Sequence, residues 1–448
     1  MTTIARATPA LAFLVLSLII ALAAGCGERS TAPSSEDKGA PLGVPHATQP
    51  PVPIPLRWVP RELIVRLTQG TSIDEFHATF GTSTIEELPQ ALTYLVATPA
   101  GMSLHDLINN MNYSSLCDYA EYNYLLDTPE SEQHSLAFYE GDYDHESYVD
   151  QYALVRIGAA KAHASSTGSG VLVAVIDTGI DLDHPDLLDN LGAPGYDFID
   201  GDNKPADLPN GTDDNGNRLI DEATGHGSHV AGIIAAAAPG VVLLPLRVLN
   251  SDGTGTAFHV TRAIYYAIDA GAQVINLSLG LEARVDAMAR AIQKARNVGV
   301  LVVASAGNRG IEDEDHFPAS LPEVMAIAAT NAFDRKALFS NYGHHISISA
   351  PGEGIMSTYW NGGYAIWSGT SMAAPFVAAA GAIRLAMEPL DPGDLRRLIE
   401  DTSFEINEGP YELGEGRVDL LALVQAPPQR RGPSSAVELL PGRTRDRP

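Results

Sequence analysis

Residues 170–180, GVLVAVIDTGI, carry a run of β-branched and apolar side chains that ends in an aspartate, Asp177. Such a run is typical of a strand that is buried on both faces, as in a parallel sheet. Similar runs recur along the chain at residues 240–249, 272–279, 299–307 and 324–330. Stretches with helical periodicity separate most of these runs, and the alternation predicts a doubly wound α/β domain with a mostly parallel sheet.

Functional residues of such a sheet gather at the carboxyl ends of its strands. Asp177 ends the first strand, and the stretch GHGSHVAG, at 225–232, places His226 at the start of a helix. Ser371 stands where a later helix begins. An aspartate at a strand end or a serine before a helix is usually structural. The glycines beside all three, however, would let a peptide backbone approach closely, which helix caps do not require.

These residue types together can hydrolyse a peptide bond. A serine hydroxyl needs a neutral imidazole to remove its proton, and the imidazole needs a carboxylate to fix its tautomer. The oxyanion needs donors already in place, which the N–H of Ser371 and the side-chain amide of Asn308 could supply. An asparagine in a glycine-flanked turn is otherwise a turn former. None of this chemistry requires a cofactor.

The two histidines of GHGSHVAG also raise the alternative of a metal site. Residues three apart can share one helical face, and His226 and His229 could hold a zinc ion there. No acidic or cysteine partner stands at zinc spacing beside them, and the glutamate of an HExxH motif is missing. We therefore interpret His226 as a base and His229 as a packing residue.

Five motifs in this order resemble those of the subtilisin-like serine proteases, or subtilases: VAVIDTGI, GHGSHVAG, INLSLG, ASAGN and GTSMAAP. The order Asp, His, Ser along the chain is that of subtilisin. The resemblance covers roughly residues 150–425. It implies that Asp177 orients the base His226, that Ser371 is the nucleophile, and that Asn308 stabilises the oxyanion.

The resemblance also implies a set of substrate-binding residues. An extended substrate would pair as an edge strand with Ser278, Leu279 and Gly280 on one side and with Gly253 and Gly255 on the other. Ser305, Ala306 and Gly307 would line the pocket for the side chain before the scissile bond. The acidic run 311–319 lies near the end of that pocket, with His316 at its floor; it could favour a basic side chain or be a solvated loop.

The region before the α/β domain suggests a small domain of its own. Residues 58–127 predict the element order β-α-β-β-α-β, which matches a ferredoxin-like fold. Taken alone this domain could be a binding module, but the resemblance implies a propeptide that assists folding and inhibits the protease until it is cleaved. Residues 128–150 are acidic and lack periodicity, which predicts an exposed connector open to proteolysis before a peptidase domain at 151–426.

The chain ends indicate export. Residues 1–25 have the form of a signal peptide, and LAAGC resembles a bacterial lipoprotein cleavage box with Cys26 as the lipidated residue. A plain secretory cleavage site is the alternative. Residues 26–57 form a proline-rich linker, and 427–448 are expected to be a disordered tail. Lipid chains on Cys26 would tether the protein to a membrane surface outside the cytoplasm. The second cysteine, Cys117, is expected to be a buried hydrophobic residue without a disulfide.

Charge and side-chain oxygens bear on other ligands. The chain has 28 basic and 55 acidic residues, a net charge of −27, which argues against nucleic acid as a partner. The loop 210–222 alternates candidate oxygen ligands for a structural calcium ion, namely Asp213, Asn215, Asn217 and Asp221. Arg218 stands where such a loop favours glycine, and an uncoordinated turn is the alternative.

The sequence thus predicts a secreted or membrane-tethered serine endopeptidase with an autoprocessed propeptide, which cleaves protein or peptide substrates through an acyl-enzyme on Ser371. An inactive subtilase fold that acts as a binding lipoprotein is the alternative from another class. A protease dedicated to one partner is a further alternative.

Overall fold

The computed structural model describes residues 55–131, 139–140, 143–406 and 411–429. All of these residues belong to one compact unit of the chain, Ile54–Pro448. The predicted signal peptide, Cys26 and nearly all of the proline-rich linker lie outside the described residues, as does the tail from residue 430 onward.

The small N-terminal domain has the predicted order of elements. Its bounds are β1 Trp58–Leu67, α1 Ile73–Phe80, β2 Ser83–Leu88, β3 Thr93–Ala97, α2 Leu104–Asn112 and β4 Cys117–Asp127, with a short 3-10 turn at Pro89–Ala91. The strands pair in the order β2-β3-β1-β4, all antiparallel. Ser72 and Ser103 cap α1 and α2 by accepting backbone N–H groups, as their position before apolar periodicity predicts. Cys117 is buried and free, as predicted.

The large domain is built on a seven-stranded sheet in the order β13-β12-β11-β10-β6-β8-β7, in which all neighbouring strands are parallel. Its strands are β6 Leu172–Asp177, β7 Tyr196–Asp197, β8 Val242–Arg247, β10 Val274–Leu277, β11 Leu301–Ser305, β12 Met325–Thr330 and β13 Ile346–Pro351. All residues of β10 to β13 are buried. The doubly wound parallel sheet is therefore confirmed.

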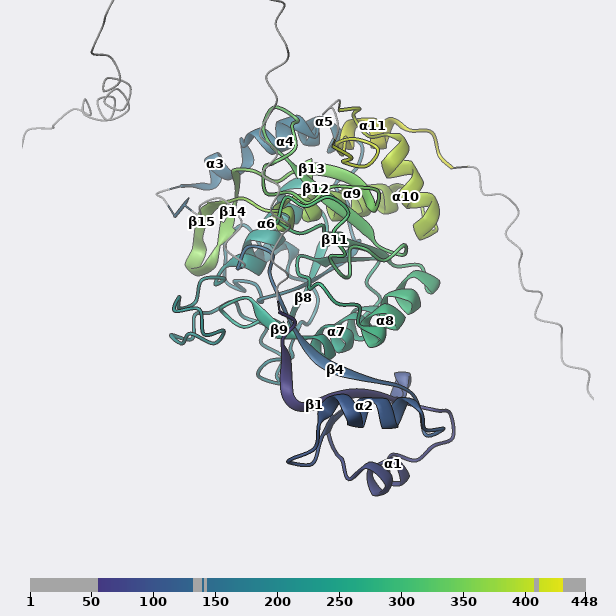
Figure 1. Cartoon of the computed structure of the whole chain (residues 1–448). Helices are drawn as coiled ribbons and strands as arrows, with labels where there is room; N and C mark the ends of the chain where they lie inside the picture. Colours follow the sequence, from purple (N-terminus) through teal and green to yellow (C-terminus); the bar gives the residue numbers. More distant parts are fainter. Residues whose placement is uncertain (1–54, 132–138, 141–142, 407–410, 430–448) are drawn as a thin grey trace, which may run out of the picture. The chain divides into compact units, whose positions relative to one another are not determined.

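Alternate side chains of β6 enter two separate cores, one on each face of the sheet. Val173 and Val175 join the core that contains α6 and α9, whereas Ala174 and Ile176 join the core that contains α7 and α8. The helices are α6 His226–Ala237, α7 Ala257–Asp269, α8 Asp286–Asn297 and α9 Thr370–Met387. Figure 1 shows α7 and α8 on the side of the sheet nearer the small domain.

Helix α9 is long and apolar enough to cross a membrane by length and composition, but 83% of its most apolar window is buried inside the protein. It is a core helix that packs against α6 and five strands of the sheet. Helices α10 Pro392–Asp401 and α11 Leu420–Gln425 follow it.

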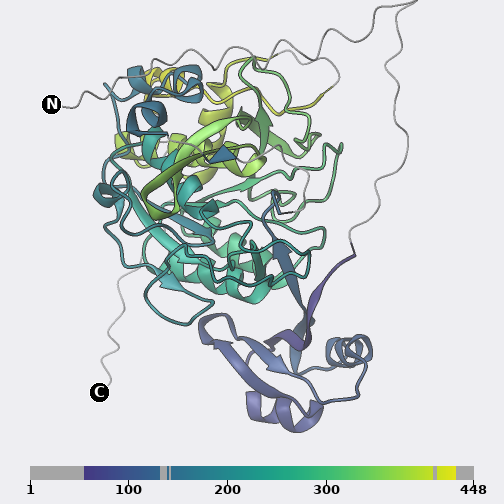
Figure 2. The same cartoon turned by 90° about the vertical axis from the view of Figure 1, so that its left-hand side faces the viewer.

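Shorter elements complete the large domain. A three-stranded sheet contains β14 Ile355–Tyr359, β15 Gly363–Trp367 and β5 Tyr139–Glu140. The short helices are α3 His145–Val149, α4 Tyr152–Arg156 and α5 Ala159–Ala162, and 3-10 turns lie at Leu188–Asn190 and Trp360–Gly362. Strand β9 Thr254–Thr256 pairs with β4, which runs from the small domain into the large one (Figure 2).

The described parts of segment 128–150 match the predicted exposed connector only in part: residues 144–150 are exposed apart from Tyr148, whereas residues 128–130 are buried. Tyr148 of α3 is buried, and its hydroxyl donates a hydrogen bond to the carbonyl of Gly232 at 2.6 Å. Thr128 and Glu130 are buried as well. The acidic composition of the segment does not predict these contacts. Thr128 and Tyr148 are uncharged, and Glu130 is buried against polar groups of the large domain.

Candidate active site

The carboxyl end of β6 and the start of α6 bring Asp177 and His226 together. His226 Nδ1 lies 2.7 Å from Asp177 Oδ1, and both side chains are fully buried. The backbone N–H of Thr178 donates to the same carboxylate oxygen at 2.7 Å, and the Thr178 hydroxyl accepts the N–H of Gly227. The aspartate is thus held in a position from which it fixes the tautomer of the imidazole.

Two glycines next to His226 make this approach possible. Gly225 has φ +87° and a Cβ there would lie 2.0 Å from the ring of Tyr359. A Cβ on Gly227 would lie 2.1 Å from the carbonyl oxygen of Gly179. The small residues that the sequence places around His226 are therefore required by close packing at the head of α6.

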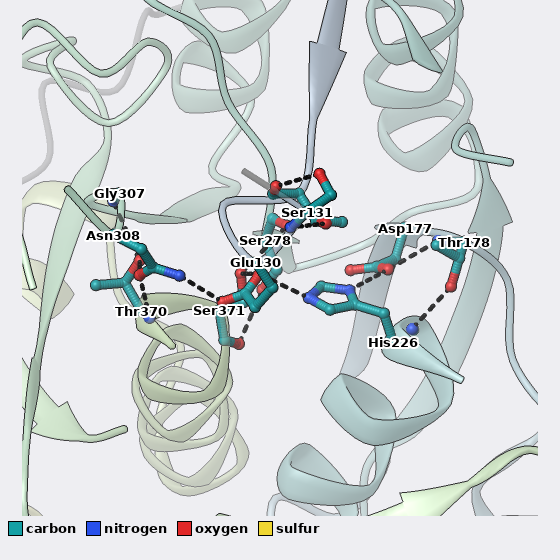
Figure 3. A network of polar contacts seen from close by, with 12 residues as sticks. Glu130, Ser131, Asp177, Thr178, His226, Ser278, Gly307, Asn308, Thr370 and Ser371 are labelled. Carbon is teal, nitrogen blue, oxygen red and sulfur yellow. Dashed lines mark hydrogen bonds and ion pairs between the residues drawn. The ribbon is translucent and has the colours of Figure 1, made fainter. Parts of the chain in front are cut away.

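Ser371 and Asn308 lie together at the other side of the site. The Asn308 carbonyl Oδ1 accepts from the backbone N–H and the hydroxyl of Thr370, both at 2.8 Å. These two bonds turn the amide Nδ2 of Asn308 toward Ser371, the second residue of α9 (Figure 3). The Ser278 hydroxyl donates to the carbonyl of Ser371 at 3.1 Å.

A residue that sequence reasoning missed, Glu130, lies at the centre of the site. Its Oε2 accepts from the Ser371 hydroxyl at 2.7 Å and lies 3.1 Å from His226 Nε2. Its Oε1 accepts from Asn308 Nδ2 at 2.9 Å. Figure 3 shows the carboxylate between the serine and the imidazole. The only sequence signal was one acid within an acidic segment.

The charges around His226 change its protonation. Burial works to lower its pKa, but the charge of Asp177 and hydrogen bonds to Asp177 and Glu130 outweigh burial and raise the pKa to about 10. With Glu130 in place the imidazole is therefore protonated at neutral pH and cannot accept a proton from Ser371.

His229 is buried one turn further along α6. Its Nε2 lies 3.1 Å from the carbonyl oxygens of Ile355 and Ala365, and its ring contacts Trp367 edge to face. Burial lowers the pKa of His229 to about 3, so the ring is neutral. It connects α6 to β14 and β15, in agreement with its interpretation as a packing residue.

The predicted substrate-binding glycines lie on both sides of one stretch of chain, Leu125–Ser131, which we call the cleft segment. The backbone of Asp127 pairs with Gly280, with N···O distances of 3.2 and 3.0 Å. The N–H of Thr128 donates to the carbonyl of Gly253 at 3.0 Å, and Leu126 pairs with Gly255. The side chain of Leu279 takes no part in this pairing, because it is buried in the core that contains α7 and α8.

His316 lies beside the predicted pocket of Ser305, Ala306 and Gly307. Its ring occupies the place of a Cβ on Gly280, which would lie 2.1 Å from Nε2, and it lies 3.1 Å from the position of a Cβ on Gly307. Its Nε2 is buried without a hydrogen-bond partner among the described residues. Burial lowers the pKa of His316 to about 4, so the ring is neutral.

The acids of the run 311–319 were predicted either to favour a basic side chain or to be solvated. Glu314 accepts from Arg309 at 2.5 Å and from Asn341 at 2.6 Å. Its charge is paired within the protein, so this acid is not free to attract a basic side chain.

The side chains of the predicted calcium ligands hold the turns of their own loop, and calcium binding there stays a prediction. Asp213 accepts the backbone N–H groups of Gly216, Asn217 and Arg218. Asp221 accepts those of Asn210 and Gly211. Within the described ranges, no group of three or more His, Cys, Asp or Glu side chains could hold a metal ion. Alternating Asp and Asn suit backbone turns as well as they suit ligation.

Comparisons with known proteins agree with this geometry. The family model described as "Subtilase family" matches residues 168–431. The chain belongs to the subtilase family. A second model, the fervidolysin N-terminal prodomain, matches residues 52–123. The chain is thus a subtilase, a serine protease that acts on protein substrates and carries an N-terminal prodomain.

Individual relatives support the same assignment. This subtilase is 37% identical over 327 residues to the "Thermophilic serine proteinase" of Bacillus sp. (strain AK1), which is 70% of this chain and 74% of the relative. It is 38% identical over 285 residues to thermitase of Thermoactinomyces vulgaris, which is 61% of this chain and 96% of the relative.

A solved structure covers both domains. The crystal structure of fervidolysin from Fervidobacterium pennivorans, described as a keratinolytic enzyme related to subtilisin, matches with a TM-score of 0.69 and 26% identity. The match covers 84% of this chain and 62% of the fervidolysin chain.

Proposed function

We propose that this subtilase is an endopeptidase in which Ser371 attacks the scissile carbonyl, His226 accepts the serine proton, and Asp177 orients the imidazole. One observation carries the proposal. The Ser371 hydroxyl and His226 Nε2 both contact a single oxygen atom, Glu130 Oε2, at 2.7 and 3.1 Å. The nucleophile and the base therefore converge on one point, which a substrate would occupy once Glu130 has left.

The reaction follows from these positions. As Ser371 Oγ bonds to the carbonyl carbon, its proton passes to His226 Nε2, and the carbonyl oxygen becomes an oxyanion. Asn308 Nδ2 and the N–H of Ser371 at the start of α9 would stabilise that oxyanion. The C–N bond then breaks as the imidazolium protonates the leaving amine, and water hydrolyses the acyl-enzyme by the same steps in reverse.

The substrate would bind as an extended strand between two backbone edges. The cleft segment pairs with Gly253 and Gly255 on one side and with Gly280 on the other. Backbone pairing is independent of side chains, so it supports a broad substrate class. Side-chain selection would fall to the region near His316 and to Ser305, Ala306 and Gly307.

Residues 58–127 would form the prodomain and residues 151–426 the peptidase domain, with autoprocessing between them. Residues 1–25 would direct export and Cys26 would carry a lipid anchor; both assignments rest on the sequence alone. The protein would then act outside the cytoplasm, at a membrane until processing separates the peptidase from the anchored prodomain.

The test is cleavage of casein together with labelling by a fluorophosphonate, which reacts with an activated serine. Ser371→Ala should lower kcat/KM by more than about a thousandfold and abolish labelling. Ser165→Ala, at an exposed serine outside the site, is the matched control and should leave both unchanged. Unchanged cleavage by Ser371→Ala would overturn the mechanism, and an absence of labelling in the processed wild type would favour a binding lipoprotein.

A further inference from the structure

The cleft segment pairs with the edges of the site as an extended substrate would, but its chain then turns back instead of staying extended. Asp127 and Thr128 pair with the cleft edges, and the chain then reverses: the N–H of Ser131 donates to the carbonyl of Thr128 at 3.1 Å, and the Ser131 hydroxyl donates to the same oxygen at 2.8 Å. Thr128, Pro129, Glu130 and Ser131 thus form a β-turn with proline at its second position, where the fixed φ of proline is favoured.

This turn brings a side chain to the place where a substrate would present a peptide carbonyl. The Glu130 side chain is 3% exposed, and its two oxygens contact Ser371, His226 and Asn308. A carboxylate carbon is a poor electrophile, because its negative charge is shared by both oxygens. The nucleophile at this position therefore has no bond to cleave.

We propose that Glu130 is a built-in inhibitor of the catalytic centre, a carboxylate ligand that the Pro129 turn inserts into the oxyanion position in place of a scissile carbonyl. This inference rests on the proposed function of Ser371, His226 and Asn308. The catalytic centre is then also a binding site for a carboxylate, and in the precursor the chain itself supplies that carboxylate.

The three contacts disable three separate catalytic groups. The Ser371 hydroxyl donates a hydrogen bond to Oε2, so it is held as a donor rather than directed at an acyl carbon. Asn308 Nδ2 is occupied by Oε1 and is not available to an oxyanion. The His226 imidazolium lies between two carboxylates, Glu130 and Asp177, and has no free nitrogen to accept a proton.

The charges explain why glutamate suits this position. The pair of carboxylates on either side of His226 stabilises the imidazolium, and Asn308 adds a donor to the outer oxygen. Hydrogen bonds that involve charged groups are stronger than neutral ones, by enough to change a binding constant roughly tenfold to a hundredfold. Glu130→Gln keeps the shape of the side chain but removes its charge.

The experiment compares full-length wild type, Glu130→Gln and Glu130→Ala. A fluorophosphonate is added during a time course, and the labelled precursor is separated from the processed enzyme by size. Glu87→Gln is the matched control, since Glu87 is an exposed acid on the small domain outside the site. We expect the uncleaved Glu130→Gln and Glu130→Ala precursors to be labelled at least about tenfold faster than wild type, and Glu87→Gln to behave as wild type.

A second measurement does not depend on the folding of any variant. A synthetic peptide spanning residues 122–131 is tested as an inhibitor of the processed wild-type enzyme, beside the same peptide with Glu130→Gln. We expect the substitution to raise the inhibition constant about tenfold or more. Equal inhibition constants, or equal labelling of the precursors while the processed enzyme is labelled normally, would overturn the role of Glu130. Labelling of no species at all, processed enzyme included, would instead overturn the proposed function.

Discussion

The carboxylate of Glu121, on β4 of the small domain, accepts the backbone N–H of Ala287 at 2.9 Å, in the first turn of α8. Its other oxygen accepts the N–H of Asp286 at 2.8 Å. One acid of the prodomain thus occupies the positive end of a helix of the peptidase domain. Burial raises the pKa of Glu121 to about 7, against the lowering effect of the two amide bonds.

This relationship predicts that the prodomain is held more weakly at high pH. An acid whose pKa is raised by docking stabilises the docked state below its ordinary pKa of 4.5, and that contribution is lost as the pH rises through about 7. The urea midpoint for release of the small domain, measured on Ser371→Ala protein, should therefore be lower at about pH 8 than at about pH 5. In Glu121→Gln the urea midpoint should depend less on pH. A midpoint that falls as steeply with pH in Glu121→Gln as in the parent protein would contradict the role of Glu121.

His226 should titrate differently in the precursor and after loss of Glu130. Its raised pKa stabilises the folded precursor fully below the ordinary value of 6.5, and this contribution is lost as the pH rises through about 10. In Ser371→Ala precursor, the low-field imidazole proton signal should persist into the alkaline range. In the double variant Ser371→Ala, Glu130→Gln, His226 should titrate at lower pH. An unchanged titration of His226 would show that Glu130 does not stabilise the imidazolium.

Gly225→Ala should damage the site through a steric clash. The new Cβ would lie 2.0 Å from the Tyr359 ring, on a residue whose φ is +87°. We expect a loss of about 1–3 kcal/mol in unfolding free energy and a fall in kcat/KM of about tenfold or more as His226 shifts. Gly211→Ala is the matched control, because Gly211 has φ +76° and nothing within 4 Å of its Cβ. It should cost about 1 kcal/mol and leave kcat/KM unchanged.

His316→Ala should widen the choice of side chain before the scissile bond. The His316 ring occupies space between Gly280 and Gly307, and its Nε2 has no partner among the described residues. Its removal should raise kcat/KM for peptides with phenylalanine at this position, relative to alanine, by roughly tenfold or more. The ratio is measured on matched peptides; an unchanged ratio would place the specificity pocket elsewhere.

The fold could be read from the sequence because its signals are local. The apolar run that ends in Asp177 is a buried strand, and its alternate residues enter two cores as the period of a strand requires. Ser72 and Ser103 cap the predicted helices for the same reason. The approach of His226 to Asp177 could be expected from the resemblance to subtilases and from the strand end at which Asp177 stands.

The position of Glu130 could not be read in this way. It contacts Ser371 across 241 residues of chain, through a turn that the acidic composition of the segment concealed. The calcium prediction stays untested for a related reason. Asp213 accepts backbone N–H groups of its own loop, and side chains that close a turn have the same spacing as side chains that bind an ion.

The turn at Pro129 has a consequence for how a population of these molecules matures. While Glu130 occupies its own catalytic centre, a precursor cuts itself only slowly, so most cuts come from neighbouring molecules that have already been freed. Each freed molecule can then release others. Maturation in this scheme proceeds with a lag that shortens as the protein becomes more concentrated, and a trace of finished enzyme abolishes the lag.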